Sequence, residues 1–551
     1  MSNYSQAHIC QCLTRLSTLR PNSIVTITGN RQTTGKQFVE NVLSLAGGLT
    51  KLGLRKGDIV AICAFNSDLY LEWLLAVAFI GGIVAPLNYR WSFEEAKSAM
   101  LSVKAVMFVA DESCSFWYSE LKINSIPSLM WHVFLDFSSS SVIQASNILT
   151  TDTLRKQGIG SPELNYSWAP ERAVLICFTS GTTGRPKGVL ISHSALTVQS
   201  LAKVAFVGYC EDDVYLHTAP LCHIGGLSSA MAMLMVGACH VFIPKFNASL
   251  AVDVIDQHNV TSLITVPATM GDLISLTSQL AQFIFQRNFV REKETWKGRH
   301  TLKKMLNGGM TESCSSLTFM TLYDPTLETP DQLLQTYGRT KLTSVNQPQG
   351  VCVGKPAPHV EIKICPDGSS HSGRILTRGP HAMLRYWDQT PSEASDRTNE
   401  IWLDTGDIGI IDGSGNLWLI GRANNRIKSG GENVHPEEVE AILLQHPGVA
   451  AAIVLGIPDA RLMEMVVACI RLREGWRWSN DDCKPLAGKE ILLCSEILQK
   501  YCREKNLSRF KVPKIFIIWR KPFPLTTSGK IRRDQIRGEV TSHLQFLPSS
   551  L

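Results

Sequence analysis

The chain has no apolar run long enough to cross a lipid bilayer. Its longest apolar stretch spans residues 74–87 and contains two glycines and a proline. A transmembrane helix needs about 20 consecutive apolar residues, so we expect no membrane span. The chain also lacks a basic segment followed by an apolar core at its start, which argues against a secretory signal.

Clustered basic residues and metal-type cysteine spacing are missing as well. The net charge is +6, and the Lys and Arg residues are spread along 551 residues. We therefore expect no nucleic-acid partner. Of the 15 cysteines, only Cys10 and Cys12 form a tight group. Two thiolates do not complete a tetrahedral zinc site, which favours reduced, buried thiols in a reducing compartment.

The first two-thirds of the chain alternates between strand-like and helix-like segments. Apolar runs at 58–63, 173–178 and 262–266 predict buried strands, and 69–79 predicts a buried helix. Apolar residues make up 44% of the chain and charged residues 19%, as in a folded globular protein. This pattern predicts an α/β fold, with more chain than one domain needs.

After Gly406 the sequence pattern changes to short strands and turns. Residues 412–416 are a tight-turn signal between two short strands, and Pro436 is well placed to start a helix that runs to Leu443. We therefore predict a large domain over residues 1–423 and a small α+β domain over residues 424–551.

The strongest chemical signal is the segment 179–188, which directly follows the predicted strand 173–178. Its glycines allow backbone N–H groups to approach an anion, its hydroxyls add donors, and Lys187 adds positive charge. The spacing does not fit a Walker A loop. The segment predicts a phosphate cradle, formed by Thr179, Ser180, Gly181, Thr182, Thr183, Gly184 and Lys187.

This loop resembles the phosphate-loop signature of the acyl-adenylate-forming (AMP-binding) superfamily. Three further segments resemble signatures of that superfamily in the same order: the ribose-binding segment at 405–407, the hinge and glycine loop at 421–434, and the catalytic-lysine segment at 524–530. The resemblance implies a large multi-layer N-terminal adenylate-forming domain and a small mobile α+β C-terminal domain. It also implies ATP, Mg²⁺ and coenzyme A as cofactors or co-substrates.

The resemblance implies a role for individual residues. Lys530 would stabilise charge on the carboxylate and the α-phosphate as the acyl-adenylate forms, with Thr182 in the catalytic set. Glu312 would bind Mg²⁺ and share in catalysis. The remaining nucleotide-binding and hinge residues would be Gly308, Gly309, Thr311, Asp407, Arg422, Lys428, Gly430 and Gly431. In this superfamily the small domain then rotates, and the CoA thiolate attacks the adenylate.

A closer resemblance is to the plant CoA ligases of 2-succinylbenzoate, which belong to phylloquinone (vitamin K1) biosynthesis. The segments 8–13, 86–92, 311–320 and 354–359 carry it. Residues 220–227 match the acyl-pocket segment of the superfamily. His223 would contact the substrate carboxylate or gate the acyl tunnel, although a structural histidine is an alternative reading.

One region departs from the superfamily pattern. The adenine-loop segment 306–309 runs directly into Met310, Thr311 and Glu312, whereas the superfamily places roughly 25 residues between the two motifs. Gly308 stands where an aromatic residue would stack on adenine, and 283–300 is a charged stretch without a counterpart. The loss of a strand would expose backbone groups. Two alternatives therefore stay open. One is a ligase for another aromatic or fatty acid (4-coumarate-like). The other is a catalytically impaired splice or gene-model variant.

Two features of the sequence bear on targeting. The residues before Glu40 are rich in Ser, Thr and Arg, as transit peptides are, although 24–28 also predicts a strand. The final Ser549-Ser550-Leu551 is related to the C-terminal peroxisomal address. We therefore expect a location in the peroxisome, the chloroplast or both, with a peroxisomal import receptor as a partner.

Overall fold

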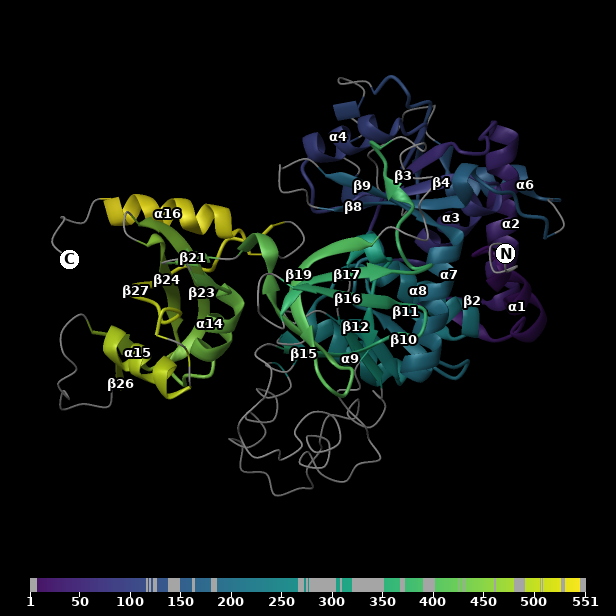
Figure 1. Ribbon diagram of the computed structural model, residues 1–551. Helices are drawn as coiled ribbons and strands as arrows, with labels where there is room; N and C mark the ends of the chain where they lie inside the picture. The colour runs from purple at the N-terminus through teal and green to yellow at the C-terminus, as the bar shows by residue number, and fades with distance from the viewer. Residues whose placement is uncertain are drawn as a thin grey trace. The chain divides into compact units, whose positions relative to one another are not determined.

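The computed structural model describes most of the chain (Figure 1). The described residues are 7–114, 117, 120–121, 126–136, 149–160, 164–179, 186–265, 272–273, 276, 304–307, 310–319, 351–366, 372–389, 402–425, 427–429, 432–459, 462–479, 491–505, 507, 509–526 and 531–545. The chain divides into two compact units. The first comprises Met1–Lys341, Pro356–Glu361 and Arg378–Leu403, and the second comprises the remaining residues up to Leu551.

An eight-stranded sheet forms one layer of the first unit, in the order β18-β9-β8-β4-β3-β5-β6-β7. The pairs from β8 to β7 are parallel, whereas β9 and β18 continue the sheet in antiparallel fashion. The strands are β3 (Ile59–Cys63), β4 (Ile83–Pro86), β5 (Met107–Ala110), β6 (Trp131–Phe134), β7 (Leu149–Thr150), β8 (Ala173–Thr179), β9 (Lys187–Ser192) and β18 (Arg385–Tyr386).

A six-stranded sheet forms a second layer, in the order β13-β12-β10-β11-β1-β2. All its pairs are parallel except the hairpin between β1 and β2. The strands are β1 (Ile24–Thr28), β2 (Arg31–Thr34), β10 (Val214–His217), β11 (Cys239–Phe242), β12 (Ser262–Thr265) and β13 (Lys304–Asn307).

Helices connect and cover these strands, as parallel sheets require. They are α1 (Gln11–Leu19), α2 (Gly35–Leu52), α3 (Asp68–Phe79), α4 (Phe93–Val103), α6 (Thr151–Gly158), α7 (His193–Lys203), α8 (Ile224–Val236) and α9 (Ala248–His258). Helix α3 contacts β4 of one sheet and β1 of the other. Every residue of α3 is buried, so this helix is shared by the cores of both layers.

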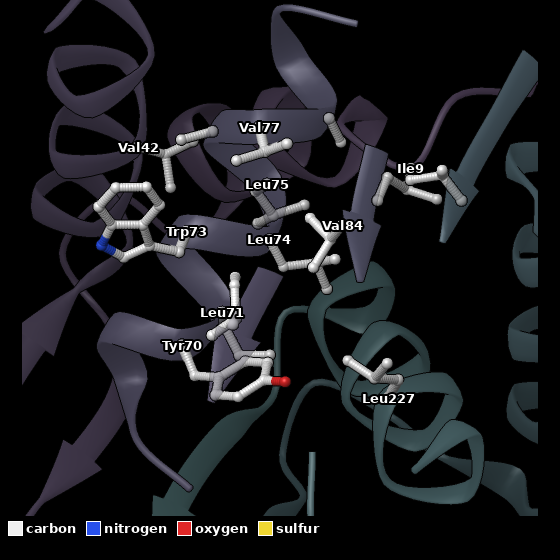
Figure 2. Packing of buried hydrophobic residues seen from close by; sticks show 14 of the residues in the cluster. Ile9, Val42, Tyr70, Leu71, Trp73, Leu74, Leu75, Val77, Val84 and Leu227 are labelled. Atoms are coloured by element: carbon white, nitrogen blue, oxygen red, sulfur yellow. The ribbon is translucent and has the colours of Figure 1, made fainter. Parts of the chain in front are cut away.

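The main core of the first unit surrounds α3. Figure 2 shows Tyr70, Leu71, Trp73 and Leu74 of this helix packed among side chains of neighbouring elements, with Val84 from β4 beside them. The Trp73 indole N–H donates to the Thr151 hydroxyl of α6 at 2.9 Å, so the one polar atom of the indole ring is satisfied.

Helix α3 also buries two carboxylates. The Arg31 guanidinium forms a two-pronged contact with Asp68, with Nη2–Oδ1 and Nε–Oδ2 distances of 2.6 and 2.9 Å. Arg155 pairs with Glu72, which also accepts a hydrogen bond from the Asn41 amide at 3.0 Å. Each buried charge thus has a partner from a neighbouring element, as the low polarity of a core demands.

The second unit contains several β-sheets. Strands β15 (Val351–Pro356), β20 (Leu417–Arg422), β19 (Leu403–Ile411), β17 (Gly373–Arg378) and β16 (Glu361–Pro366) lie side by side in that order. A second sheet contains β22 (Glu432–Val434), β21 (Ile427–Ser429), β24 (Met463–Leu472) and β23 (Val449–Asp459), with β27 (Ile515–Ile518) on β24. The remaining elements are β25 (Trp476–Trp478), β26 (Ile491–Leu493), α14 (Pro436–Leu443), α15 (Ser495–Glu504) and α16 (Arg533–Gln545).

The structure confirms the α/β prediction. The predicted strands correspond to β1, β3, β8 and β12, and the predicted buried helix is α3. Residues 412–416 connect β19 to β20, and α14 begins at Pro436. The apolar stretch 74–87 is divided between the end of α3 and β4. Within the described ranges, no helix combines the length and apolarity that crossing a membrane requires. The domain boundary at residue 423 stays a prediction.

Helices α2 and α6 pack closely at Gly48, and substitution of this glycine tests the packing. A Cβ at Gly48 would lie 2.1 Å from the Leu154 carbonyl oxygen of α6. Because the obstacle is backbone, Gly48→Ala should lower the free energy of unfolding by about 1–3 kcal/mol or more. Urea denaturation followed by tryptophan fluorescence measures this loss.

The matched control is Gly538→Ala in α16. A Cβ at Gly538 meets no atom within 4 Å. Alanine is better than glycine in an exposed helix, so this change should stabilise the second unit by about 0.5–1 kcal/mol. An unchanged unfolding midpoint for Gly48→Ala would contradict the close packing of α2 and α6.

Candidate active site

The candidate site begins at the carboxyl ends of parallel strands, where open α/β sheets bind ligands. Thr179 is the last residue of β8, and Asn307 is the last residue of β13. The predicted phosphate loop follows Thr179, and the predicted adenine-loop glycines follow Asn307. Thr179 is paired with Lys187 in the β8–β9 register, so both ends of the predicted phosphate loop are fixed by the same sheet.

Three side chains from separate segments converge near Lys187, the first residue of β9. The Tyr386 hydroxyl donates to Glu312 Oε1 at 3.2 Å. The Lys187 ammonium lies 5.7 Å from the centre of the Tyr386 ring. Strand β18 carries Tyr386 onto β9, opposite Val189, which places the tyrosine next to the end of the loop. Tyr386 thus connects the predicted metal residue with the predicted phosphate-binding lysine.

The electrostatics of Tyr386 suit this connecting position. Burial and the neighbouring Glu312 carboxylate raise the pKa of Tyr386 to about 12. Both effects disfavour a second negative charge beside the carboxylate. The phenol therefore keeps its proton at neutral pH and orients Glu312 as a hydrogen-bond donor.

Glu312 itself is presented by a tight turn. Residues Thr311–Ser313 form a single 3₁₀ turn, and the Met383 N–H donates to the Glu312 carbonyl at 2.8 Å. Cys314 and Ser315 follow with φ values of +52° and +113°, a conformation that costs free energy for residues with a side chain. The surroundings must therefore hold this turn in place.

Gln199 of α7 holds the Glu312 turn in place. Its amide Nε2 donates to the Ser313 carbonyl at 3.3 Å and also to the Ser316 carbonyl. Its Oε1 lies 3.0 Å from His359 Nε2. Burial lowers the pKa of His359, which favours the neutral ring. Sequence reasoning missed both Tyr386 and Gln199, because each becomes informative only through its contact with the 311–316 turn.

His223 lies at the beginning of α8, where it precedes the first helical residue. Its backbone N–H donates to the Pro220 carbonyl at 3.1 Å. The side chain is half-buried in a chain segment whose following residues are almost all buried. This position is compatible with contact to a small molecule, and the assignment of His223 as a substrate residue remains a prediction.

Asp407 and Arg422 are neighbours in the second unit. They are paired in the register of β19 and β20, and Arg422 Nε lies 2.7 Å from Asp407 Oδ1. Arg422 Nη1 also donates to the Thr405 carbonyl at 3.3 Å. Thr405 Oγ1 in turn accepts from the Asp407 N–H at 3.1 Å. The structure thus brings two of the predicted nucleotide-binding residues into one ion pair.

Lys428 lies in β21, opposite Asn433. Several predicted site residues lie outside the described residues: Ser180, Gly181, Thr182, Thr183, Gly184, Gly308, Gly309, Gly430, Gly431 and Lys530. Their roles, like those of the described site residues, remain predictions.

The donor set around Glu312 fits Mg²⁺. Mg²⁺ prefers oxygen ligands and is usually held by one or two carboxylates together with substrate phosphates. Glu312 offers one carboxylate, which accepts from the Tyr386 hydroxyl, and the ring of Tyr386 lies 5.7 Å from the Lys187 ammonium. Among the described residues, no three His, Cys, Asp or Glu side chains form a metal cage. A single carboxylate that completes its coordination sphere with phosphate oxygens is the arrangement that these residues allow.

Sequence comparison assigns both parts of the chain to one family. Residues 14–387 match the AMP-binding enzyme model, and residues 438–530 match its C-terminal domain. The chain is 54% identical to the chloroplastic/peroxisomal 2-succinylbenzoate–CoA ligase of Arabidopsis thaliana, over the full length of both chains. It is 28% identical to an indoleacetate–CoA ligase of Aromatoleum aromaticum, over 91% of this chain and 92% of that protein.

Solved structures agree with these matches. The o-succinylbenzoate CoA synthetase of Bacillus subtilis, solved with its acyl-adenylate intermediate, superposes with a TM-score of 0.69. The two chains are 25% identical, and the match covers 96% of this chain and 97% of the other. With its two matched domains and a full-length relative at 54% identity, this chain belongs to the AMP-binding enzyme family, as an AMP-forming acid–CoA ligase.

Proposed function

We propose that this chain ligates 2-succinylbenzoate to coenzyme A at the expense of ATP, which is converted to AMP and pyrophosphate. The observation that carries the proposal is the 54% identity to a 2-succinylbenzoate–CoA ligase over the full length of both proteins. The product, 2-succinylbenzoyl-CoA, would enter phylloquinone biosynthesis. The chemistry divides into two half-reactions, namely formation of an acyl-adenylate and transfer of the acyl group to the CoA thiol.

The first half-reaction needs positive charge around the triphosphate. Enzymes of this family use ATP with Mg²⁺. In our proposal the loop 179–187 binds the phosphates through backbone N–H groups, hydroxyls and Lys187, and Glu312 holds Mg²⁺ against them. Tyr386 supports this arrangement, since its hydroxyl fixes Glu312 and its ring lies beside Lys187.

The proposal also gives roles to residues of the second unit. Asp407 would accept hydrogen bonds from ribose hydroxyls, and Arg422 would orient Asp407 through their ion pair at 2.7 Å. Lys530 would stabilise the negative charge that develops as the substrate carboxylate attacks the α-phosphate. The CoA thiolate would then attack the acyl carbon of the adenylate and displace AMP, with 421–434 as the hinge and glycine loop.

The short connection between β13 and the Glu312 turn bears on activity. Only residues 308–310 separate Asn307 from Thr311. The alignment with the Arabidopsis ligase extends over 572 positions, whereas this chain has 551 residues, so the relative carries residues that this chain lacks. We propose that the 306–312 junction accounts for some of them and that it weakens adenine binding.

The proposal includes location and partners. The Arabidopsis relative is named chloroplastic/peroxisomal, which supports the peroxisome, the chloroplast or both for this chain. A peroxisomal import receptor that recognises Ser549, Ser550 and Leu551 is part of the same proposal. The acid, ATP and CoA are its small-molecule partners. The indoleacetate–CoA ligase at 28% identity favours another aromatic acid as the second candidate substrate.

The deciding experiment measures pyrophosphate release by the full chain with Mg-ATP and 2-succinylbenzoate, with and without CoA. Lys530→Ala should reduce the rate of release by about 100- to 1,000-fold, because it removes charge stabilisation in the transition state. Lys500→Ala, at an exposed lysine of α15, should leave the rate unchanged.

Two negative results have different meanings. A folded wild-type chain that is inactive, but becomes active when a family-like segment is inserted between Gly309 and Met310, is a defective ligase. Inactivity of both forms with 2-succinylbenzoate would refute the substrate assignment, and the indoleacetate and coumarate assays would then identify the acid.

A second prediction concerns Glu312. Glu312→Gln removes the negative charge but keeps the shape, so the Mg²⁺ concentration for half-maximal pyrophosphate release should rise at least about 10-fold. Tyr386→Phe should raise it less, since it removes only the orienting hydroxyl. Glu94→Gln, on the exposed first turn of α4, serves as the control. An unaltered Mg²⁺ dependence in Glu312→Gln would exclude Glu312 as the metal ligand.

A further inference from the structure

Lys203, the last residue of α7, is completely buried. Its ammonium donates to Ser228 Oγ at 2.6 Å and to Ser229 Oγ at 2.9 Å. The third contact, to the Gly225 carbonyl, is long at 3.5 Å. Two of the three N–H donors thus have short partners, and the third is weakly held.

Among the residues that the structure describes, no carboxylate pairs with this charge. Within the described residues, no Asp or Glu oxygen lies within 4.0 Å of the Lys203 ammonium. Buried lysines almost always have an anionic partner, because a desolvated ammonium is costly. Burial lowers the pKa of Lys203 to about 7. In the absence of an anion, the ammonium therefore loses its proton near neutral pH.

The position of Lys203 links it to the candidate site. It lies one helical turn after Gln199 on the same face of α7, and Gln199 holds the turn that carries Glu312. Its partners Gly225, Ser228 and Ser229 belong to the first turns of α8, directly after His223. A π-helical turn, Val204–Gly208, follows Lys203, and such turns occur frequently at functional sites.

The acceptor of the long Lys203 contact belongs to a partly exposed residue. Gly225 is partly exposed, although almost every other residue of α8 is buried. Among the described residues, a Cβ placed on Gly225 would meet only the end of the Ile264 side chain within 4 Å, at 3.7 Å. The carbonyl that receives the long contact from Lys203 thus lies near the start of α8, two residues after the predicted substrate residue His223.

We propose that Lys203 binds the second carboxylate of a dicarboxylic acid substrate, the one that is not converted to the adenylate, and thereby selects dicarboxylates over monocarboxylates. This inference rests on the proposed function, because 2-succinylbenzoate keeps one carboxylate after the other is activated. The substrate carboxylate replaces the long contact to Gly225 and supplies the missing negative charge. A neutral acyl chain leaves the ammonium without a counterion.

Substitution of Lys203 tests the proposal with three acids. They are 2-succinylbenzoate, 4-oxo-4-phenylbutanoate, which lacks the ring carboxylate, and 2-butanoylbenzoate, which lacks the side-chain carboxylate. Lys203→Met should reduce kcat/KM for 2-succinylbenzoate about 10- to 100-fold, as expected for the loss of a charged hydrogen bond. For whichever monocarboxylate the wild type accepts, kcat/KM should change by less than about twofold.

Two controls separate this effect from misfolding. Thermal denaturation should show that Lys203→Met melts at the wild-type temperature or higher, because methionine fills similar space without a buried charge. Lys36→Met, at an exposed lysine of α2, should leave both kinetic constants unchanged. Isothermal titration of 2-succinylbenzoate into protein with bound AMP provides a readout that does not need turnover, and its affinity should fall by the same factor.

The outcomes distinguish the two proposals. If the wild type uses 2-succinylbenzoate and Lys203→Met retains its preference for the dicarboxylate, the role of Lys203 is refuted and the proposed function stands. An equal loss for the dicarboxylate and the monocarboxylate also refutes it, since that pattern indicates a structural role. If the wild type neither turns over nor binds 2-succinylbenzoate, the proposed function fails and the role of Lys203 fails with it.

Discussion

The complete burial of α3 is the constraint on which the first unit depends. This helix contacts β4 of the eight-stranded sheet and β1 of the six-stranded sheet, so neither layer has a complete core without it. Its apolar residues supply the packing, and its two carboxylates are neutralised by Arg31 and Arg155. A helix with no exposed face must match all its neighbours at once, because protein interiors tolerate few voids.

That shared core fixes the strand ends from which the site is built. β8 ends at Thr179 and β13 ends at Asn307, and both are followed by segments with the composition of nucleotide-binding loops. The Glu312 turn adopts costly backbone angles and is held from α7 through Gln199. The scaffold therefore stabilises a local conformation that the turn would not adopt alone, which is a general property of catalytic sites.

Two buried polar side chains of α7, Gln199 and Lys203, contact hydroxyls and carbonyls instead of opposite charges. Gln199 is saturated by backbone carbonyls and His359, whereas Lys203 has two serine hydroxyls and one long carbonyl contact. The contrast matters because both residues lie on one face of α7. The first has the contacts of a positioning residue, and the second has an unmet demand for an anion.

The local elements and the chemical character of the loops could be predicted from the amino-acid sequence. Apolar runs were sufficient to predict β3, β8 and α3, and Pro436 marked the start of α14, because these signals act over a few residues. Ordered motifs such as 179–188 and 405–407 identified the family for the same reason. Only the folded structure shows that Tyr386 meets Glu312, that Asp407 pairs with Arg422 and that Lys203 is buried with no carboxylate partner among the described residues. Those facts depend on contacts between residues distant in sequence or on the burial of a single side chain, and no local pattern encodes either.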